Sequence, residues 1–132
     1  MNRFILLLAS NLNAKFQIHE ACDYLAKSFP LGIRFSENHW SDAVIKPGQS
    51  VPTGESARYL NTVCMGFTDV ALDDFQALLK KKETDMGRDR GKKTYGCVAI
   101  DMDLVEWNGD ILRPNDAAQD YYRVCLKDLL LK

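Results

Sequence analysis

Apolar and polar residues follow two different spacings along this chain, and the spacings predict both strands and helices. Short apolar or alternating runs bounded by turn residues are typical of β-strands, whereas apolar residues three or four positions apart are typical of helices. The predicted strands cover residues 4–9, 32–45, 58–67 and 96–105. The predicted helices cover residues 13–29, 70–86 and 116–131.

Turn-forming residues mark the boundaries of these elements. Pro30 ends the first predicted helix, and Gly87 suits the position just after the second one, where glycine commonly adopts a left-handed conformation. Asp69 is a candidate N-cap for the second helix. Residues 46–57 contain two prolines, two glycines and few apolar side chains, so they are predicted to form a loop.

The predicted order of elements is β-α-β-β-α-β with a further C-terminal helix. This order is typical of the α+β class and of the ferredoxin-like sandwich, in which the helices pack on one face of an antiparallel sheet. A chain of 132 residues is of the size of one domain, so residues 1–132 are expected to form a single domain. The other face of the sheet would be open for a ligand or an added layer.

The last predicted strand carries two aspartates. Asp101 and Asp103 alternate with the apolar Ile100, Met102 and Leu104. Because side chains of a strand alternate between faces, the two carboxylates should lie about 7 Å apart on one face while the apolar side chains enter the core. We expect the aspartates on the face that the two main helices leave uncovered.

Composition excludes several classes of protein. A net charge of −1 gives no bulk attraction to nucleic acid or to an anionic membrane. The apolar run at 4–9 is too short for a signal peptide or a membrane span. The four cysteines form no Cys-x-x-Cys pair and the chain has two histidines, so a zinc site is not expected. Reduced thiols and a cytoplasmic location are expected instead.

Positive charge gathers just before the two aspartates. Residues 80–93 hold seven basic side chains against three acidic ones. Glu83 lies within this segment but falls on the apolar stripe of the predicted helix, where a carboxylate needs a partner. A salt bridge to Lys80 or Arg90 is one explanation. The stripe is formed by Leu72, Phe75, Leu79, Glu83 and Met86.

Paired carboxylates next to arginines suit a magnesium–polyphosphate site. Mg²⁺ is usually bound by one or two carboxylates together with phosphate oxygens and water. Arg88 and Arg90 could hold phosphates through bidentate hydrogen bonds. No Gly-x-x-x-x-Gly-Lys-Ser/Thr segment is present, which excludes a P-loop. The alternative is that Asp101 and Asp103 only form a solvent-exposed face of the strand. The basic residues would likewise only form a solvent-exposed end of the helix.

Four segments in order resemble one known family. They are Leu-Leu-Ala-Ser-Asn-Leu at 7–12, Tyr-Leu-Asn-Thr-Val at 59–63, Glu-x-x-x-Gly-Arg-x-Arg at 83–90 and Tyr-Gly-x-x-x-Ile-Asp-Met-Asp-Leu at 95–104. Together they resemble 6-hydroxymethyl-7,8-dihydropterin pyrophosphokinase, a transferase of folate biosynthesis that moves pyrophosphate from ATP to a pterin. The resemblance covers most of the chain.

The resemblance implies a role for each matching residue. Asp101 and Asp103 would hold two Mg²⁺ ions together with ATP, and Arg88 and Arg90 would complete the catalytic set. The nucleotide would contact Glu83, Arg90, Leu104, Arg113 and Arg123. The pterin would contact Ser41, Val44, Tyr59, Asn61 and Tyr95. The expected function is therefore Mg²⁺-dependent pyrophosphate transfer from ATP to 6-hydroxymethyl-7,8-dihydropterin or a related small alcohol.

The chain also departs from the pattern of the family. Val98 stands where the family has an arginine before its Asp-x-Asp strand, and the segment 113–116 lacks the family's histidine. The family's late Arg-x-Phe corresponds to 123–125 without the aromatic residue, for which Tyr121 or Tyr122 is a candidate substitute. These departures leave two alternatives open: a non-catalytic nucleotide- or pterin-binding paralogue, and a ferredoxin-like interaction module, for example for RNA.

Overall fold

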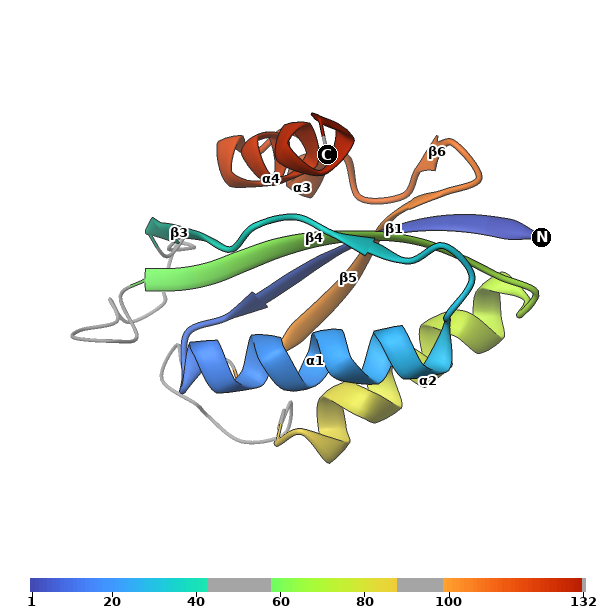
Figure 1. Cartoon of the computed structure of the whole chain (residues 1–132), viewed down its shortest axis with the longest axis horizontal. Coiled ribbons are helices and arrows are strands. Elements are labelled where there is room, and N and C mark those ends of the chain that lie inside the picture. The colour runs from blue at the N-terminus through green and yellow to red at the C-terminus, as the bar shows by residue number, and fades with distance from the viewer. Residues whose placement is uncertain (43–57, 88–98, 132) are drawn as a thin grey trace.

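The computed structural model describes residues 1–42, 58–87 and 99–131, which form six strands and four helices (Figure 1). The strands are β1 (Asn2–Ser10), β2 (Arg34–Phe35), β3 (His39–Asp42), β4 (Arg58–Thr68), β5 (Asp101–Trp107) and β6 (Asp110–Ile111). The helices are α1 (Ala14–Ser28), α2 (Leu72–Asp85), α3 (Pro114–Ala117) and α4 (Asp120–Leu131). Within the described ranges, no helix has the length and apolar character needed to cross a bilayer.

The strands form one open antiparallel sheet between two helical layers. β1 lies in the middle, paired with β4 on one side and with β5 on the other, in the order β2-β4-β1-β5-β6. β3 also pairs with β4, next to β2 along the same edge. α1 and α2 cover one face of the sheet, and α3 and α4 lie on the other (Figure 1). The predicted α+β class with an antiparallel sheet and a C-terminal helix is confirmed.

The sheet has a hydrophobic core on each face. β1 is apolar at consecutive positions, so its side chains are buried on both sides. Phe4, Leu6 and Leu8 pack with α1 and α2, whereas Ile5 and Leu7 pack towards α4. The core under α4 is completed by Val63, Val105, Tyr122, Cys125 and Leu129.

The alternation along β5 places the two aspartates as expected. Met102 and Leu104 belong to the core under α1 and α2, whereas Asp103 pairs with Leu7, whose side chain faces α4. The register shifts by one residue further along, where Leu6 lies opposite Leu104 but Ile5 lies opposite Glu106. The carboxylates therefore emerge on the face that α1 and α2 do not cover, as the sequence predicted.

The prediction of one continuous strand over 32–45 is wrong. Between β2 and β3, Ser36 bonds to β4 through its side chain, because its Oγ accepts the Val63 N–H at 2.9 Å. Thr62 in turn donates its Oγ1 hydrogen to the Ser36 carbonyl at 3.1 Å. The Ser36 N–H still donates to the Val63 carbonyl at 2.8 Å, but the return bond from Val63 goes to the Ser36 side chain, and the edge is divided into two short strands there. Residues 43–45 lie outside the described residues.

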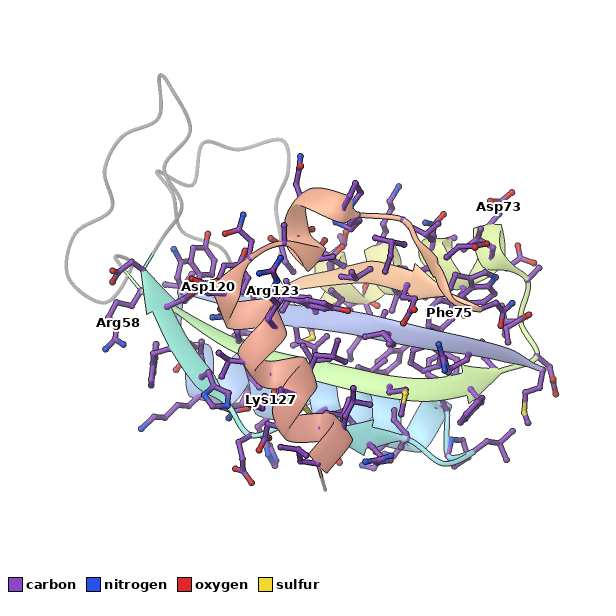
Figure 2. The ribbon with its side chains drawn as sticks, turned by 90° about the horizontal axis from the view of Figure 1, so that it is seen from above. Arg58, Asp73, Phe75, Asp120, Arg123 and Lys127 are labelled. Atoms are coloured by element: carbon purple, nitrogen blue, oxygen red, sulfur yellow. The ribbon has the colours of Figure 1, made fainter. Side chains whose placement is uncertain are left out.

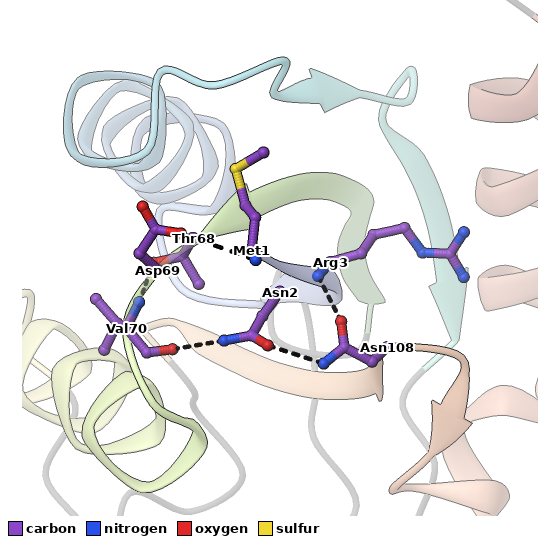
Figure 3. Close-up of polar contacts among 7 residues, drawn as sticks. All are labelled: Met1, Asn2, Arg3, Thr68, Asp69, Val70 and Asn108. Carbon is purple, nitrogen blue, oxygen red and sulfur yellow. Dashed lines mark hydrogen bonds and ion pairs between the residues drawn. The ribbon is translucent and has the colours of Figure 1, made fainter.

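The prediction that Asp69 caps the second helix is also wrong. α2 begins at Leu72 after Ala71, which makes no side-chain capping bond. Asp69 is exposed, and its Oδ1 lies 4.0 Å from the amino group of Met1 (Figure 3). The Thr68 hydroxyl receives the Val70 N–H at 3.1 Å instead. At the other end, Gly87 has φ of 100°, as expected for a residue after a helix.

The C-terminal region differs from the single helix predicted over 116–131. It contains α3 and α4, and a hairpin to β6 precedes them. The hairpin turn uses Asn108 and Gly109, both with positive φ. Asn108 also ties the turn to β1: its Oδ1 accepts the Arg3 N–H at 2.8 Å, and its Nδ2 donates to the Asn2 Oδ1 at 2.9 Å (Figure 3).

Two polar contacts attach the β2–β3 segment to the end of α4. The Arg34 guanidinium donates to the Leu129 carbonyl at 2.6 Å, and Asp128 Oδ2 accepts the Glu37 N–H at 2.6 Å. Figure 2 shows α4 lying across the strands of the sheet. These contacts fix α4 above β3 and so define the space between them.

Gly66 is expected to be essential for stability. It lies opposite Phe4 in the sheet, and a Cβ there would come within 2.6 Å of the Phe4 ring. That ring is buried and packs against Phe29 and Phe75, so it has little room to move. We expect Gly66→Ala to lower the free energy of unfolding by about 1–3 kcal/mol in urea titrations.

The smaller side chain in Phe4→Leu should relieve that clash. The double variant Phe4→Leu/Gly66→Ala should therefore lose less stability than the sum of its two single changes. A Gly66→Ala variant as stable as the unchanged chain would refute this packing argument.

Candidate active site

A polar cleft of about 510 Å³ runs along β5 beside α2. The cleft contains both aspartates and side chains from both faces of β5, so it lies at the edge of that strand. We call it the acidic cleft. It is lined by Gln76, Leu79, Lys80, Glu83, Asp101, Met102, Asp103, Leu104, Leu112 and Arg113.

Asp103 lies in an environment that disfavours its ionised form. Burial and the neighbouring Asp101 raise the pKa of Asp103 from 3.8 to about 7, against the opposing effect of Arg113. Asp116 and Glu83 add smaller increases to this pKa. So much negative charge in a partly buried place favours a cation.

Arg113 connects the acidic pair to the start of α3. Its Nε–H donates to Asp116 Oδ2, and its terminal nitrogen lies 3.9 Å from Asp103 Oδ2. The side chain of Arg113 is about half exposed. Its guanidinium therefore lies beside the carboxylates and within the cleft, in a position to contact an anionic ligand.

Glu83 supports the strand between the two aspartates. Its side chain is 2% exposed, which confirms its place on the buried stripe of α2. Glu83 Oε2 accepts the backbone N–H of Met102 at 2.9 Å. The described partner is thus the backbone N–H of Met102 on β5. The salt bridge of Glu83 to Lys80 or Arg90 stays a sequence prediction, and Arg90 lies outside the described residues. A buried charge that accepts a backbone hydrogen bond fixes α2 against β5 at the acidic pair.

The acidic pair fits Mg²⁺ by the chemistry of its donors. Mg²⁺ takes oxygen ligands and is commonly held by one or two carboxylates while phosphates and water complete the shell. Asp101 and Asp103 supply two such carboxylates at the wall of one cleft. In the described part of the chain, no group of three or more histidine, cysteine or acidic residues is placed to hold a metal.

A second cavity of about 370 Å³ lies between β3 and α4. Strand residues form one wall and helix residues form the other. We call it the β3–α4 cavity. It is lined by His39, Trp40, Ser41, Asp42, Gln119, Asp120, Tyr121 and Val124.

Asn61 of β4 supports β3, the strand that forms one wall of this cavity. It is 1% exposed, and its Nδ2 donates to Ser41 Oγ at 2.8 Å and to the His39 carbonyl at 3.1 Å. Its own carbonyl accepts a weak bond from Cys125 Sγ of α4 at 3.8 Å. Asn61 therefore acts on the cavity through Ser41 and β3 in this structure.

Of the two candidate aromatic substitutes, Tyr121 faces the cavity. Tyr122 is 3% exposed in the core under α4, whereas Tyr121 lines the β3–α4 cavity. Burial raises the pKa of Tyr121, and the charges of Asp116 and Asp103 raise it further. Arg113 lines the acidic cleft and Gln119 lines the β3–α4 cavity, so the short helix α3 connects the linings of the two cavities.

The structure brings together part of the predicted site. Glu83, Asp101, Asp103, Leu104 and Arg113 all line the acidic cleft. Ser41 lines the β3–α4 cavity, and half-buried Tyr59 lies opposite Ser41 on β4. Arg123 lies exposed on α4 and lines neither cavity (Figure 2). The predictions for Arg88, Arg90, Val44 and Tyr95 fall outside the described residues.

Other residues that line the two cavities were not predicted from the sequence. Gln76 and Lys80 lie one turn apart on α2 and precede Glu83 at helical spacing, which was a usable signal. His39 lies two residues before Ser41 on one strand, so the two share a face. Leu112 follows a hairpin that was not predicted.

A sequence comparison shows the family to which the chain belongs. The family model for 7,8-dihydro-6-hydroxymethylpterin-pyrophosphokinase (HPPK) matches residues 5–130 of this chain. The chain belongs to the HPPK family. A search of curated proteins found no significant match. Membership implies pyrophosphate transfer in folate biosynthesis, with ATP and a pterin as the family's substrates.

Asp103 is expected to make stability depend on pH. Between pH 4 and 7 its carboxyl is protonated in the folded chain but ionised in the unfolded chain, so stability falls as pH rises through this range. We expect Asp103→Asn, measured without divalent cations, to raise the melting temperature by about 3 °C or more at pH 8. The gain should be smaller at pH 5, where the folded wild type already carries the neutral form.

Asp110→Asn is the matched control, because Asp110 is an exposed aspartate of β6 outside the cleft. It should change the melting temperature little at either pH. An equal gain from Asp103→Asn at pH 5 and pH 8 would contradict the raised pKa.

Proposed function

We propose that this chain catalyses Mg²⁺-dependent transfer of pyrophosphate from ATP to 6-hydroxymethyl-7,8-dihydropterin or a related small alcohol. The observation that carries this proposal is the position of the acidic pair. Asp101 and Asp103 line one cleft with Arg113, and α3 leads from Arg113 to the Gln119–Tyr121 wall of the β3–α4 cavity. A reaction between two substrates needs two neighbouring binding sites. Where one substrate is a polyphosphate, positive charge is also needed at the place where its phosphates meet the other substrate.

The chemistry needs positioning more than covalent participation by the protein. The substrate hydroxyl oxygen attacks the β-phosphorus of ATP, the bond from this phosphorus to the oxygen of the α-phosphate breaks, and AMP leaves. The hydroxyl proton is lost to solvent. Phosphoryl-type transfers of this kind are accelerated mainly by alignment and by stabilisation of charge on the phosphate oxygens.

Asp101 and Asp103 would hold the metal, with two Mg²⁺ ions expected when ATP is bound. Mg²⁺ neutralises negative charge on the nucleotide phosphates. Arg113 lies 3.9 Å from Asp103 and is close enough to share a phosphate ligand of the same cleft. Glu83 keeps the backbone of β5 in place through its bond to Met102.

The remaining lining of the acidic cleft supports a nucleotide. Leu79, Leu104 and Leu112 contribute apolar surface suited to a base or ribose. Lys80 adds a positive charge that suits phosphate. A cleft with an apolar part and a charged part matches the two ends of ATP.

The β3–α4 cavity supports the second substrate. Its volume falls within the range of about 300–1,000 Å³ that is typical of small-molecule sites. Ser41 and Tyr121 would contact the substrate, and Asn61 and Tyr59 remain sequence predictions for the same site. Arg88, Arg90, Val44, Tyr95 and Arg123 also remain sequence predictions.

The strand order supports the finer assignment of the fold. β1 lies between β4 and β5, as the first strand of a ferredoxin-like sandwich lies between the third and fourth. β2 and β3 together take the place of the second strand. We therefore keep the ferredoxin-like assignment and the single domain over residues 1–132 as part of the proposal.

The two alternative functions make different predictions. A non-catalytic paralogue would bind ATP or the pterin without forming a product. An RNA-binding sheet would need exposed aromatic side chains on its open face, but here α4 packs on that face and Asp101 and Asp103 lie beside it. The structure therefore favours a small-molecule site over an RNA platform.

Activity provides the direct test. Protein mixed with ATP, Mg²⁺ and 6-hydroxymethyl-7,8-dihydropterin should release AMP, measured by chromatography. We expect Asp101→Asn and Asp103→Asn each to reduce kcat at least about a hundredfold, because each change removes one carboxylate from the metal site.

Asp110→Asn is again the control and should keep the activity. Tight binding of ATP and pterin with no AMP would support the non-catalytic paralogue. Undiminished activity in both aspartate variants would refute the proposed metal site.

Arg113 is expected to contact the nucleotide rather than the pterin. We expect Arg113→Ala to weaken binding of a non-hydrolysable ATP analogue with Mg²⁺ about tenfold in calorimetry, because a charge-assisted contact to phosphate is lost. Arg3→Ala removes an arginine paired with Glu106 outside the cleft and should leave this affinity unchanged. Equal affinity in the Arg113→Ala variant would remove Arg113 from the nucleotide site.

A further inference from the structure

His39 has an unusual environment on the wall of the β3–α4 cavity. Among the described residues, its Nε2 is the buried side-chain nitrogen or oxygen that has no hydrogen-bond partner. Buried polar atoms in proteins nearly always have a partner, and one left without it costs about 1–3 kcal/mol. The atom therefore calls for an explanation.

The sheet and α4 hold His39 in this position. On β3, His39 pairs with Asn61 and Ser41 pairs with Tyr59, so the side chains of 39 and 41 share one face. Tyr121 and Val124 of α4 form the facing wall of the same cavity. The bonds from Arg34 and Asp128 keep this wall in place.

The amide opposite the imidazole on β4 is already engaged in other hydrogen bonds. The Asn61 side chain, which lies directly opposite on β4, donates its Nδ2 hydrogens to the His39 carbonyl and to Ser41 Oγ. The cavity beside His39 measures about 370 Å³, far more than the roughly 30 Å³ that one water occupies in the liquid. The cavity has room for a ring system with its own polar edge, and because Nε2 is buried in the ligand-free chain, the His39 ring must turn towards the cavity to meet that edge.

The other lining side chains indicate which chemistry suits that ring. Tyr121 and Trp40 offer aromatic surface, and Asp42 and Asp120 place carboxylates in the lining. Aromatic walls favour a planar ligand, and carboxylates favour N–H donors on its edge. The combination suits an amino-substituted planar heterocycle.

We infer that His39 is a substrate-binding residue whose Nε2 forms a hydrogen bond with the edge of an amino-substituted heterocycle that packs against Tyr121. This inference rests on the proposed function, because it assigns the second substrate to the β3–α4 cavity. It adds a contact that neither the sequence motifs nor the family match assigns. Nε2 meets the ligand as a donor or as an acceptor, according to whether it carries a hydrogen.

Direct observation of the imidazole is practical because the chain contains two histidines, His19 and His39. Nitrogen-15 NMR of the two rings gives two sets of signals, and His19→Gln assigns them. We expect 6-hydroxymethyl-7,8-dihydropterin, added with a non-hydrolysable ATP analogue and Mg²⁺, to shift the Nε2 signal of His39. The signals of His19, which is exposed on α1, should stay in place.

Kinetics of matched variants distinguish a hydrogen bond from a packing role. His39→Phe keeps a ring but removes the nitrogen, and His39→Gln places an amide near the position of Nε2. We expect His39→Phe to raise KM for the pterin about tenfold, with kcat and KM for ATP nearly unchanged, and His39→Gln to restore part of the loss. His19→Gln is the control and should match the unchanged chain.

The outcomes separate this inference from the proposed function. AMP formation together with an unshifted His39 signal in the saturated complex overturns the inference and leaves the function standing. A shifted His39 signal without AMP formation supports the inference and refutes catalysis. Equal pterin KM values for His39→Phe and the unchanged chain, or no pterin binding at all, also overturn the inference.

Discussion

The alternation of side chains along β5 is the constraint on which the site depends. Met102 and Leu104 are buried under α1 and α2, and burial of each such side chain stabilises the fold by about 1.5–3 kcal/mol. A shift of the strand by one residue would expose them and bury both carboxylates among apolar side chains. The register is therefore set by the core, and the acidic pair follows from it.

Glu83 reinforces this register from the helix side. β6 pairs only with Glu106 and Trp107 among the described residues of β5, so the first half of β5 has an open edge there. The Met102 N–H on this edge donates to Glu83 rather than to another strand. A buried carboxylate thus takes the place of a strand partner, and the edge remains available as the wall of the acidic cleft.

The sequence predicted most of the fold because its strongest signals are periodic. The apolar stripe of α2, with Glu83 on it, and the alternation around Asp101 and Asp103 are both present in the structure. The errors fall where side chains compete with the backbone: Ser36 breaks the edge strand, and Asn108–Gly109 forms a turn whose Asn-Gly signal was overlooked.

The site was predictable only in part, for a related reason. Glu83, Asp101 and Arg113 meet at a cleft that family motifs already mark, whereas His39 and Tyr121 meet because α4 folds back over β3. The bonds from Arg34 to Leu129 and from Glu37 to Asp128 that hold α4 there join residues 95 and 91 positions apart, and no local pattern encodes them. The periodic spacing of apolar residues does not predict long-range packing of this kind.

The acidic pair also explains why the folded chain should bind a cation well. Ionising Asp103 beside Asp101 opposes folding, as the raised pKa of Asp103 shows. A cation that met both carboxylates, as proposed, would remove this repulsion and would therefore bind the folded state more tightly than the unfolded state. Arg113 compensates only in part, since it is shared with Asp116. The chain therefore gives up stability in the metal-free state at the place where its proposed chemistry needs positive charge.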